Sequence, residues 1–141
     1  MTRYVDTSLL VAALTAEAAT DRCQAWLAGH PPGDLAISHW VIAEFSAALS
    51  VKHRTKAIDA DQHADALRAF QIMARRSLQV FSVEGRQFEM AARLADRYEL
   101  GLRAGDALHL AIARDHAARL CTLDRRLAEA AKALGVDVEP I

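Results

Sequence analysis

Four acidic residues stand where a folded chain could gather them into one site. Asp6 and Asp124 each lie between a short β-type run and a helical pattern. Asp106 lies in the first turn of a third helical pattern, and Glu44 lies about a turn and a half into another. Strand ends and helix starts share one edge of a parallel α/β sheet, and ligands bind at that edge. We therefore expect all four carboxyl groups at the same edge of the molecule.

Carboxylates gathered in one place repel each other and raise each other's pKa unless a cation joins them. Oxygen ligands suit Mg²⁺, which takes one or two carboxylates together with water and substrate phosphate, and Mn²⁺ accepts the same ligands. We find no covalent nucleophile with a base beside it and no Walker-type glycine-rich loop. The chemistry that these acids suit is metal-dependent hydrolysis of a phosphodiester.

A simpler interpretation exists for most of these residues. Asp6, Asp106 and Asp124 could each stabilise a helix start, because acids are favoured there. Glu44 is too deep in its helix to be a cap and could instead be a boundary residue with its carboxylate in solvent. His109, three residues after Asp106, is expected to be a packed or capping side chain and not a ligand.

Strand and helix patterns alternate along the chain, which predicts one α/β domain over residues 1–141 with a mainly parallel sheet. Strands are expected at 4–5, 35–37, 78–83, 119–122 and 136–141. Helices are expected at 9–14, 19–27, 39–52, 59–74, 88–98, 104–112 and 125–134. Ser38 is expected to cap the helix that follows it.

The composition is that of a globular protein, with 52% hydrophobic and 25% charged residues in 141. Cys23 and Cys121 are far apart and lack metal-type spacing, which favours a reduced, cytoplasmic protein over a disulfide framework. No apolar run approaches a membrane span, and Asp6 interrupts any signal-peptide pattern. We therefore expect no membrane association.

A net charge of −1 does not indicate the basic surface that a general nucleic-acid binder has. If the four acids hold metal, however, the rest of the chain is slightly basic, and a phosphate substrate is not excluded. Basic residues available to line the approach are Arg75, Arg76, Arg103, Arg125 and Arg126. The basic run 52–56 is interpreted as a solvated helix end.

Several motifs in this order resemble those of the PIN-domain nucleases. They are Asp6-Thr7-Ser8, Glu44, the segment 104–111 around Asp106 (AGDALHLA), and the segment 122–127 around Asp124 (TLDRRL). The resemblance covers essentially the whole chain. The length of the chain and the segment around Asp124 are most similar to those of the VapC-type toxins of type II toxin–antitoxin systems.

The resemblance implies a three-layer α/β/α sandwich around a parallel sheet of four or five strands, and a Mg²⁺- or Mn²⁺-dependent endoribonuclease activity. Asp6 and Asp106 would be the principal metal ligands, completed by Glu44 and Asp124, directly or through water. Ser8 and Thr122 match positions where a small hydroxyl supports the carboxylates. The family's toxins cut RNA, commonly form homodimers and are silenced by a cognate VapB-type antitoxin, which often places a basic residue in the acidic pocket.

Two other classes of function share part of this pattern. A non-catalytic PIN-like module could bind RNA or a basic peptide through the same pocket, although a pure phosphate binder has no use for four acids. A receiver-type signalling domain is also α/β and binds Mg²⁺, but it needs a lysine at a strand end, and none is so placed.

Overall fold

A five-stranded sheet forms the centre of the computed structural model, which describes residues 1–141. Its strand order is β3-β2-β1-β4-β5, and every neighbouring pair is parallel. The predicted parallel sheet is therefore confirmed, with β1 in the middle and β3 and β5 at the edges. The strands are β1 (Arg3–Val5), β2 (Leu35–Ser38), β3 (Leu78–Phe81), β4 (Arg119–Cys121) and β5 (Val138–Glu139).

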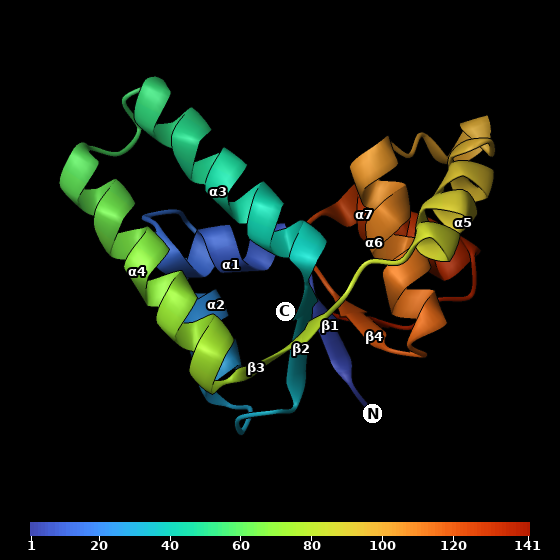
Figure 1. The fold of residues 1–141 in the computed structure, drawn as a ribbon, viewed down its shortest axis with the longest axis horizontal. Helices are drawn as coiled ribbons and strands as arrows, with labels where there is room; N and C mark the ends of the chain where they lie inside the picture. The colour runs from blue at the N-terminus through green and yellow to red at the C-terminus, as the bar shows by residue number, and fades with distance from the viewer.

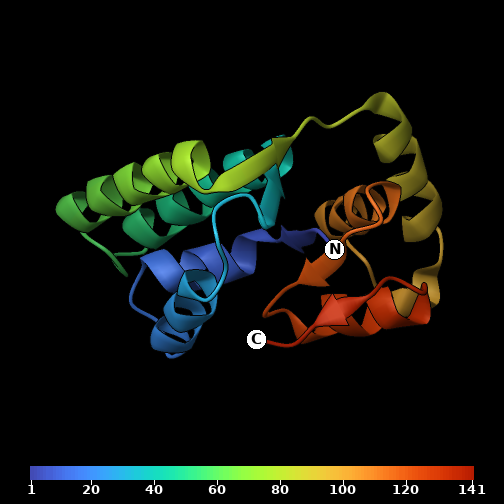
Figure 2. The ribbon, with the colours of Figure 1, turned by 90° about the horizontal axis from the view of Figure 1, so that it is seen from below.

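Helices cover both faces of this sheet, which gives the expected three-layer sandwich (Figures 1 and 2). One layer holds α1 (Thr7–Leu14), α2 (Thr20–Ala28), α3 (His39–Arg54) and α4 (Ala60–Arg76). The other holds α5 (Gly85–Ala95), α6 (Ala104–Asp115) and α7 (Arg125–Ala133), with the short 3-10 helix η1 (Tyr98–Leu100) between α5 and α6. None of these helices has the length and apolarity needed to cross a membrane.

The core is built around β1, α1 and α6. Leu9 and Leu10 of α1 are fully buried, as are Leu110 and Ile112 of α6. Burial of each such side chain contributes about 1.5–3 kcal/mol. Asp6 is the N-cap of α1 and Asp106 lies in the first turn of α6, so this packing fixes the backbone that presents both acids.

The helix predicted at 88–98 is displaced in the structure, where α5 runs from Gly85 to Ala95. It begins earlier because the backbone N–H of Glu84 donates to the Gln87 side chain at 2.8 Å, which satisfies one group at the helix start. The helix also ends earlier than predicted, at Ala95, so that Tyr98 lies outside it, in η1. Similarly, Asp59 is the N-cap of α4 rather than its first residue, and accepts from Gln62 N at 2.8 Å.

Candidate functional site

Asp6 follows the last residue of β1 and is nearly buried, with 3% of its surface exposed. Its Oδ1 accepts hydrogen bonds from the Ser8 hydroxyl at 2.7 Å and from the Leu9 N–H at 3.4 Å. Its Oδ2 accepts from the Thr122 hydroxyl at 2.6 Å. Asp6 therefore caps α1, as the simpler interpretation held, and it is also fixed by hydroxyls from two elements.

The two hydroxyls that hold Asp6 are themselves oriented by the backbone after β4. Thr122 Oγ1 accepts from the Asp124 N–H at 3.0 Å, and Ser8 Oγ accepts from the Leu123 N–H at 3.1 Å. Since each hydroxyl has one hydrogen, these contacts leave that hydrogen free to point at Asp6. The structure thus places Ser8 and Thr122 directly against the carboxylate that they were expected to support.

Burial raises the pKa of Asp6, because the charged carboxylate loses hydration. The charge of a protonated His109 and the hydrogen bonds from Thr122, Ser8 and Leu9 oppose this effect without cancelling it. The carboxyl group is thus held in place but costly to ionise. A cation beside it would favour the ionised form.

Glu44 lies on α3, and its carboxylate is held from two sides. Its Oε1 accepts from the Thr7 hydroxyl at 2.7 Å and lies 2.5 Å from Nε2 of His109. A carboxylate only accepts, so Nε2 carries a hydrogen, and Nδ1 on the other side of the ring lies 2.9 Å from Tyr4 Oη. Tyr4 Oη in turn lies 2.8 Å from Ser38 Oγ. A hydrogen-bonded chain therefore links β2, β1, α6, α3 and α1.

This chain sets the ionisation of its members. Partial burial raises the pKa of Glu44, but the hydrogen bond and charge of His109 and the hydrogen bond from Thr7 outweigh it and leave the pKa below its ordinary value. Burial likewise raises the pKa of Tyr4 well above the usual range, so its hydroxyl stays protonated. Of these two acids, Glu44 consequently ionises more readily than Asp6.

Asp106 and Asp124 line the same pocket, a cavity of about 220 Å³ bordered by η1, α6 and α7. Asp124 is the N-cap of α7 and accepts from Arg126 N at 2.9 Å and Leu127 N at 3.2 Å. Asp106 makes one longer contact, in which its Oδ2 accepts from Arg103 N at 3.4 Å. Asp106 is thus the least restrained of the four carboxylates.

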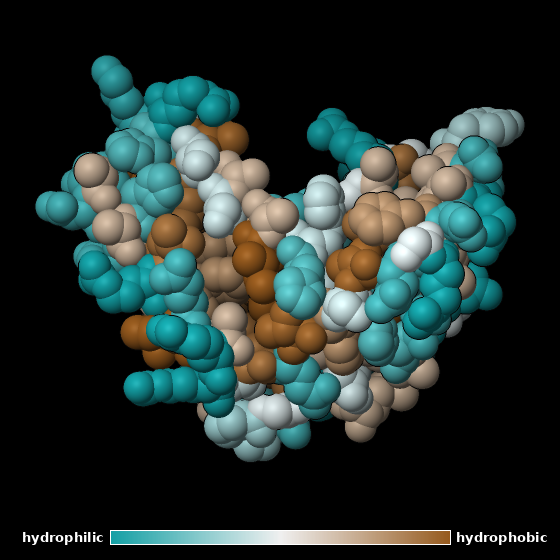
Figure 3. Space-filling view, viewed as in Figure 1, coloured by the Kyte–Doolittle hydropathy of each residue, from teal (hydrophilic) through white to brown (hydrophobic).

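Gly105, the residue before Asp106, packs closely against the Glu44 side chain. A Cβ atom on Gly105 would lie 3.2 Å from Glu44 Oε2 and 3.4 Å from Trp40 Cζ2. This close approach places the Glu44 carboxylate against the backbone directly before Asp106. The hollow visible between the α3–α4 and α5–α7 parts of the molecule lies over this edge of the sheet, where β1 and β2 end (Figures 1 and 3).

The four carboxylates do not form one compact cluster. No group of three or more His, Cys, Asp or Glu side chains lies close enough to hold a metal ion. Glu44 pairs with His109 and Thr7, Asp6 is held by hydroxyls, and Asp106 shares its pocket with Asp124. One or two carboxylates suffice for Mg²⁺ when water and substrate phosphate complete its octahedron. The all-oxygen pair of Asp106 and Asp124 fits such an ion.

Two of the five arginines expected to line the approach to the site, Arg103 and Arg126, line this pocket. The Arg126 guanidinium donates to the Gly101 carbonyl at 2.7 Å. Arg125 is exposed at the start of α7, whereas Arg75 borders a separate cavity with Ile42 and Phe70. Fewer arginines therefore line the pocket than the sequence predicted.

Sequence reasoning missed the part that His109, Tyr4, Ser38 and Thr7 take in holding Glu44. His109 was expected to be packed, and it is 3% exposed, but both of its ring nitrogens are used at the site. The available signal was the spacing of Asp106 and His109, which places both on one side of α6. The partners Tyr4 and Ser38 could be identified only from the sheet order, which puts β1 beside β2.

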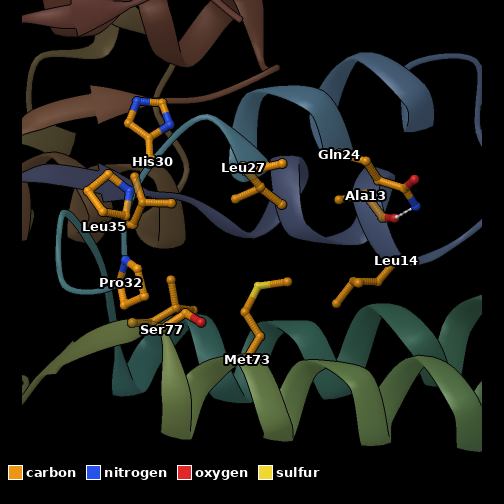
Figure 4. Close-up of a pocket in the computed structure, with 12 residues that line it drawn as sticks. Ala13, Leu14, Gln24, Leu27, His30, Pro32, Leu35, Met73 and Ser77 are labelled. Carbon is orange, nitrogen blue, oxygen red and sulfur yellow. Dashed lines mark hydrogen bonds between the residues drawn. The ribbon is translucent and has the colours of Figure 1, made fainter.

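A larger cavity, about 440 Å³, lies elsewhere, between α1, α2 and α4 (Figure 4). Leu14, Leu27 and Met73 point into it, and Gln24 at its edge is tied to the Ala13 carbonyl at 2.8 Å. No carboxylate lines this cavity. It therefore offers no carboxylate ligand for the metal ion that metal-dependent hydrolysis needs.

Comparison with solved structures shows the same fold in several proteins. VapC20 of Mycobacterium tuberculosis, a toxin that cleaves the sarcin–ricin loop, aligns with TM-score 0.74 and 22% identity over 92% of this chain and 95% of its own. PAE2754 of Pyrobaculum aerophilum aligns with TM-score 0.70 and 25% identity over 98% and 90%. VapBC2 of Rickettsia felis, solved on a DNA fragment from its promoter, aligns with TM-score 0.69 and 20% identity over 100% and 99%.

No curated protein matches the chain. The family model described as PIN domain, however, matches residues 3–133, which include all four candidate acids and both supporting hydroxyls. This match covers nearly the whole sequence and agrees with the observed sheet order and layers. The chain belongs to the PIN domain family.

Proposed function

We propose that this protein is a metal-dependent endoribonuclease and the toxin of a type II toxin–antitoxin pair. The observation that carries the proposal is the pocket shared by Asp106 and Asp124, with Asp6 fixed behind it through Thr122. The likeness to VapC20, an RNA-cleaving toxin, agrees with this activity.

In the proposed reaction, Asp106 and Asp124 would hold Mg²⁺ or Mn²⁺ in the cavity that they share, and Asp6 at the end of β1 would complete the site. When bound, the cation supplies charge that makes water a better nucleophile and steadies the oxyanion that develops on phosphorus. Glu44, which His109 and Thr7 keep oriented and ionised, orients the attacking water. Arg103 and Arg126 at the pocket neutralise part of the phosphate charge.

The pocket also suits an inhibitory partner. Two carboxylates in one cavity attract a lysine or arginine side chain, and such a side chain would occupy the place of the cation. We propose that a cognate VapB-type antitoxin silences the enzyme in this way. Among the structural relatives, VapBC2 was solved as a pair on promoter DNA, which agrees with a partnered state. We also propose that the chain forms a homodimer, which sedimentation velocity would test.

Cleavage of RNA with Mn²⁺ tests the activity. Asp106→Asn should lower the cleavage rate at least about 100-fold, as loss of a charge at the reacting phosphate commonly does. Asp61→Asn is the matched control, because Asp61 also lies in the first turn of a helix, α4, but far from the pocket. Equal cleavage by the wild type and Asp106→Asn would rule out the proposed site.

A non-catalytic binding module remains the second candidate, because Asp6 and Asp124 both make ordinary helix-cap contacts. It predicts RNA binding that does not need Mn²⁺ and no cleavage of any RNA tested. Cleavage that is lost in Asp106→Asn and retained in Asp61→Asn would exclude it.

A further inference from the structure

The indole N–H of Trp40 is buried and has no hydrogen-bond partner in the protein. It is the one buried side-chain polar atom of which this is true, and folded proteins leave few such groups because each costs free energy. The other tryptophan is paired, since the Trp26 N–H donates to Glu139 Oε1 at 3.2 Å. Buried donors without a protein partner are commonly satisfied by a bound water molecule.

Trp40 lies on the same side of α3 as Glu44. The two residues are four positions apart, which makes their side chains neighbours on the helix surface. Both side chains reach Gly105 of α6, where a Cβ atom would lie 3.2 Å from Glu44 Oε2 and 3.6 Å from Trp40 Nε1. The unpaired donor and one oxygen of a candidate site carboxylate therefore adjoin the same point, directly before Asp106.

The two oxygens of the Glu44 carboxylate are held unequally. Oε1 accepts from the Thr7 hydroxyl at 2.7 Å and lies 2.5 Å from His109 Nε2, whereas no protein donor bonds to Oε2. The last torsion of a glutamate side chain is broad, so bonds to one oxygen leave the other free to swing. Oε2 consequently needs a donor of its own if Glu44 is to present a fixed geometry to the site.

A water molecule can join the unpaired donor to this oxygen. The indole N–H only donates and the carboxylate only accepts, and a water molecule can accept from the first and donate to the second. A cavity of about 230 Å³ is bordered by Trp40 and Gly105, and a water molecule takes up only about 30 Å³. The place where the two side chains meet therefore has both the room and the polar partners that a buried water molecule requires.

We propose that Trp40 is a positioning residue, whose indole N–H donates to a water molecule that in turn donates to Glu44 Oε2. Thr7 and His109 would then fix one oxygen of the carboxylate, and Trp40 would fix the other. The effect on catalysis rests on the proposed function, in which Glu44 orients the attacking water. The link between Trp40 and Glu44 does not rest on it.

Nuclear magnetic resonance tests the link without RNA or metal. A ¹H–¹⁵N spectrum should show two indole resonances, which Trp26→Phe assigns. Glu44→Gln should shift the Trp40 resonance and leave that of Trp26 in place. Glu139→Gln is the matched control and should do the opposite, because Glu139 accepts from Trp26.

The same protein shows whether water makes the link. The Trp40 indole proton should give a cross-relaxation peak with a bound water molecule, and Gly105→Ala, whose methyl group enters the shared space, should weaken that peak. An unmoved Trp40 resonance in Glu44→Gln would overturn the inference. So would the absence of a water peak at the Trp40 indole proton in the wild type.

Cleavage kinetics with Mn²⁺ test the positioning role. Trp40→Phe keeps an aromatic ring but removes the N–H, and it should lower kcat about 10-fold, the effect of losing one hydrogen bond to a charged group. KM should stay within about 2-fold, because the N–H does not bind the substrate. Trp26→Phe, which loses the bond to Glu139, should keep the kcat of the wild type and lower the midpoint of urea denaturation. A purely structural Trp40 would show that same pattern, a lowered midpoint with normal kcat, and would overturn the positioning role.

Failure of the proposed function looks different from failure of this inference. If the function fails, the wild type does not cleave RNA with Mn²⁺, while the Trp40 resonance still responds to Glu44→Gln. If the inference fails, the wild type and Trp40→Phe cleave equally well, and the Trp40 resonance does not respond.

Discussion

The imidazole Nε2 of His109 lies 2.5 Å from Oε1 of Glu44, and this contact joins α6 to α3 beside the candidate site. Removal of the imidazole should take one hydrogen-bond partner from each of two groups, the Glu44 carboxylate, which keeps Thr7, and the Tyr4 hydroxyl, which keeps Ser38. We expect His109→Ala to lower the free energy of unfolding by about 2–4 kcal/mol, because a hydrogen bond to a charged group contributes about 1.5–3 kcal/mol and the buried imidazole leaves a cavity. Urea denaturation measures it. A change below about 0.5 kcal/mol would show that the contact contributes nothing.

Tyr4→Phe removes only the Tyr4 hydroxyl from the same chain of hydrogen bonds. The ring remains in the core, but its hydrogen bonds with Ser38 and His109 are lost. Because Ser38 and His109 keep other partners, we expect a smaller loss of about 1 kcal/mol. Urea denaturation of Tyr4→Phe beside His109→Ala makes the comparison. An equal or larger loss in Tyr4→Phe would show that the Tyr4 hydroxyl, and not the contact between His109 and Glu44, carries most of the stabilisation.

Asp6→Asn should change stability as well as activity. Both carboxylate oxygens of Asp6 accept from hydroxyls, so an amide NH₂ would face a donor on one side. We expect a loss of about 1–3 kcal/mol in the free energy of unfolding. Asp106→Asn, which has only one long contact to lose, should stay within about 0.5 kcal/mol of the wild type. Thermal or urea unfolding of both variants checks this, and equal losses would mean that Asp6 is no more tightly held than Asp106.

Gly105→Ala separates stability from activity. A methyl group there would press on Glu44 Oε2 at 3.2 Å and move the carboxylate, so RNA cleavage should fall about 10-fold or more. Alanine favours a helix over glycine by about 1 kcal/mol. The free energy of unfolding should therefore stay close to that of the wild type while cleavage falls. Gly85→Ala, where a methyl group meets nothing within 4 Å, is the control. Normal cleavage in Gly105→Ala would show that the position of Glu44 does not matter.

Glu139 makes stability depend on pH. Burial raises its pKa, but hydrogen bonds from Arg3, Arg119 and Trp26 and the charge of Arg3 outweigh this and hold the pKa below its ordinary value of 4.5. A lowered folded-state pKa stabilises the protein fully above the ordinary value, and this stabilisation is lost as pH falls through the folded-state pKa. Wild type should therefore exceed Glu139→Gln in stability at pH 7, and the difference should shrink below pH 4.5.

Urea denaturation at pH 7 and at low pH measures the dependence on Glu139. Glu129→Gln, at an exposed position of α7, is the control and should show little difference from the wild type at either pH. A stability difference between wild type and Glu139→Gln that grows on acidification would contradict the sign of the pKa shift.

The sequence predicted the sheet because its strands are short apolar runs bounded by clear turns and caps. Asp6 could be placed directly after β1 for the same reason, whereas Asp124 lies three residues beyond the end of β4, as the N-cap of α7. The supporting hydroxyls of Ser8 and Thr122 were expected from the resemblance to the family. The partners of Glu44 could not be predicted this way, because His109 lies 65 residues from Glu44 and reaches it only through helix packing. The start of α5 was also missed, since its signal is a side-chain contact between Glu84 and Gln87 and not a hydrophobic period.

The most direct test of the account is a calorimetric titration with Mn²⁺ of the wild type, Asp106→Asn and Asp61→Asn, with RNA cleavage measured on the same samples. Asp106→Asn should weaken Mn²⁺ binding and abolish cleavage together, while Asp61→Asn should match the wild type in both. Unchanged Mn²⁺ affinity in Asp106→Asn would show that Asp106 only stabilises the start of α6. Asp106 would then not be a metal ligand, although the chain would still belong to the PIN domain family.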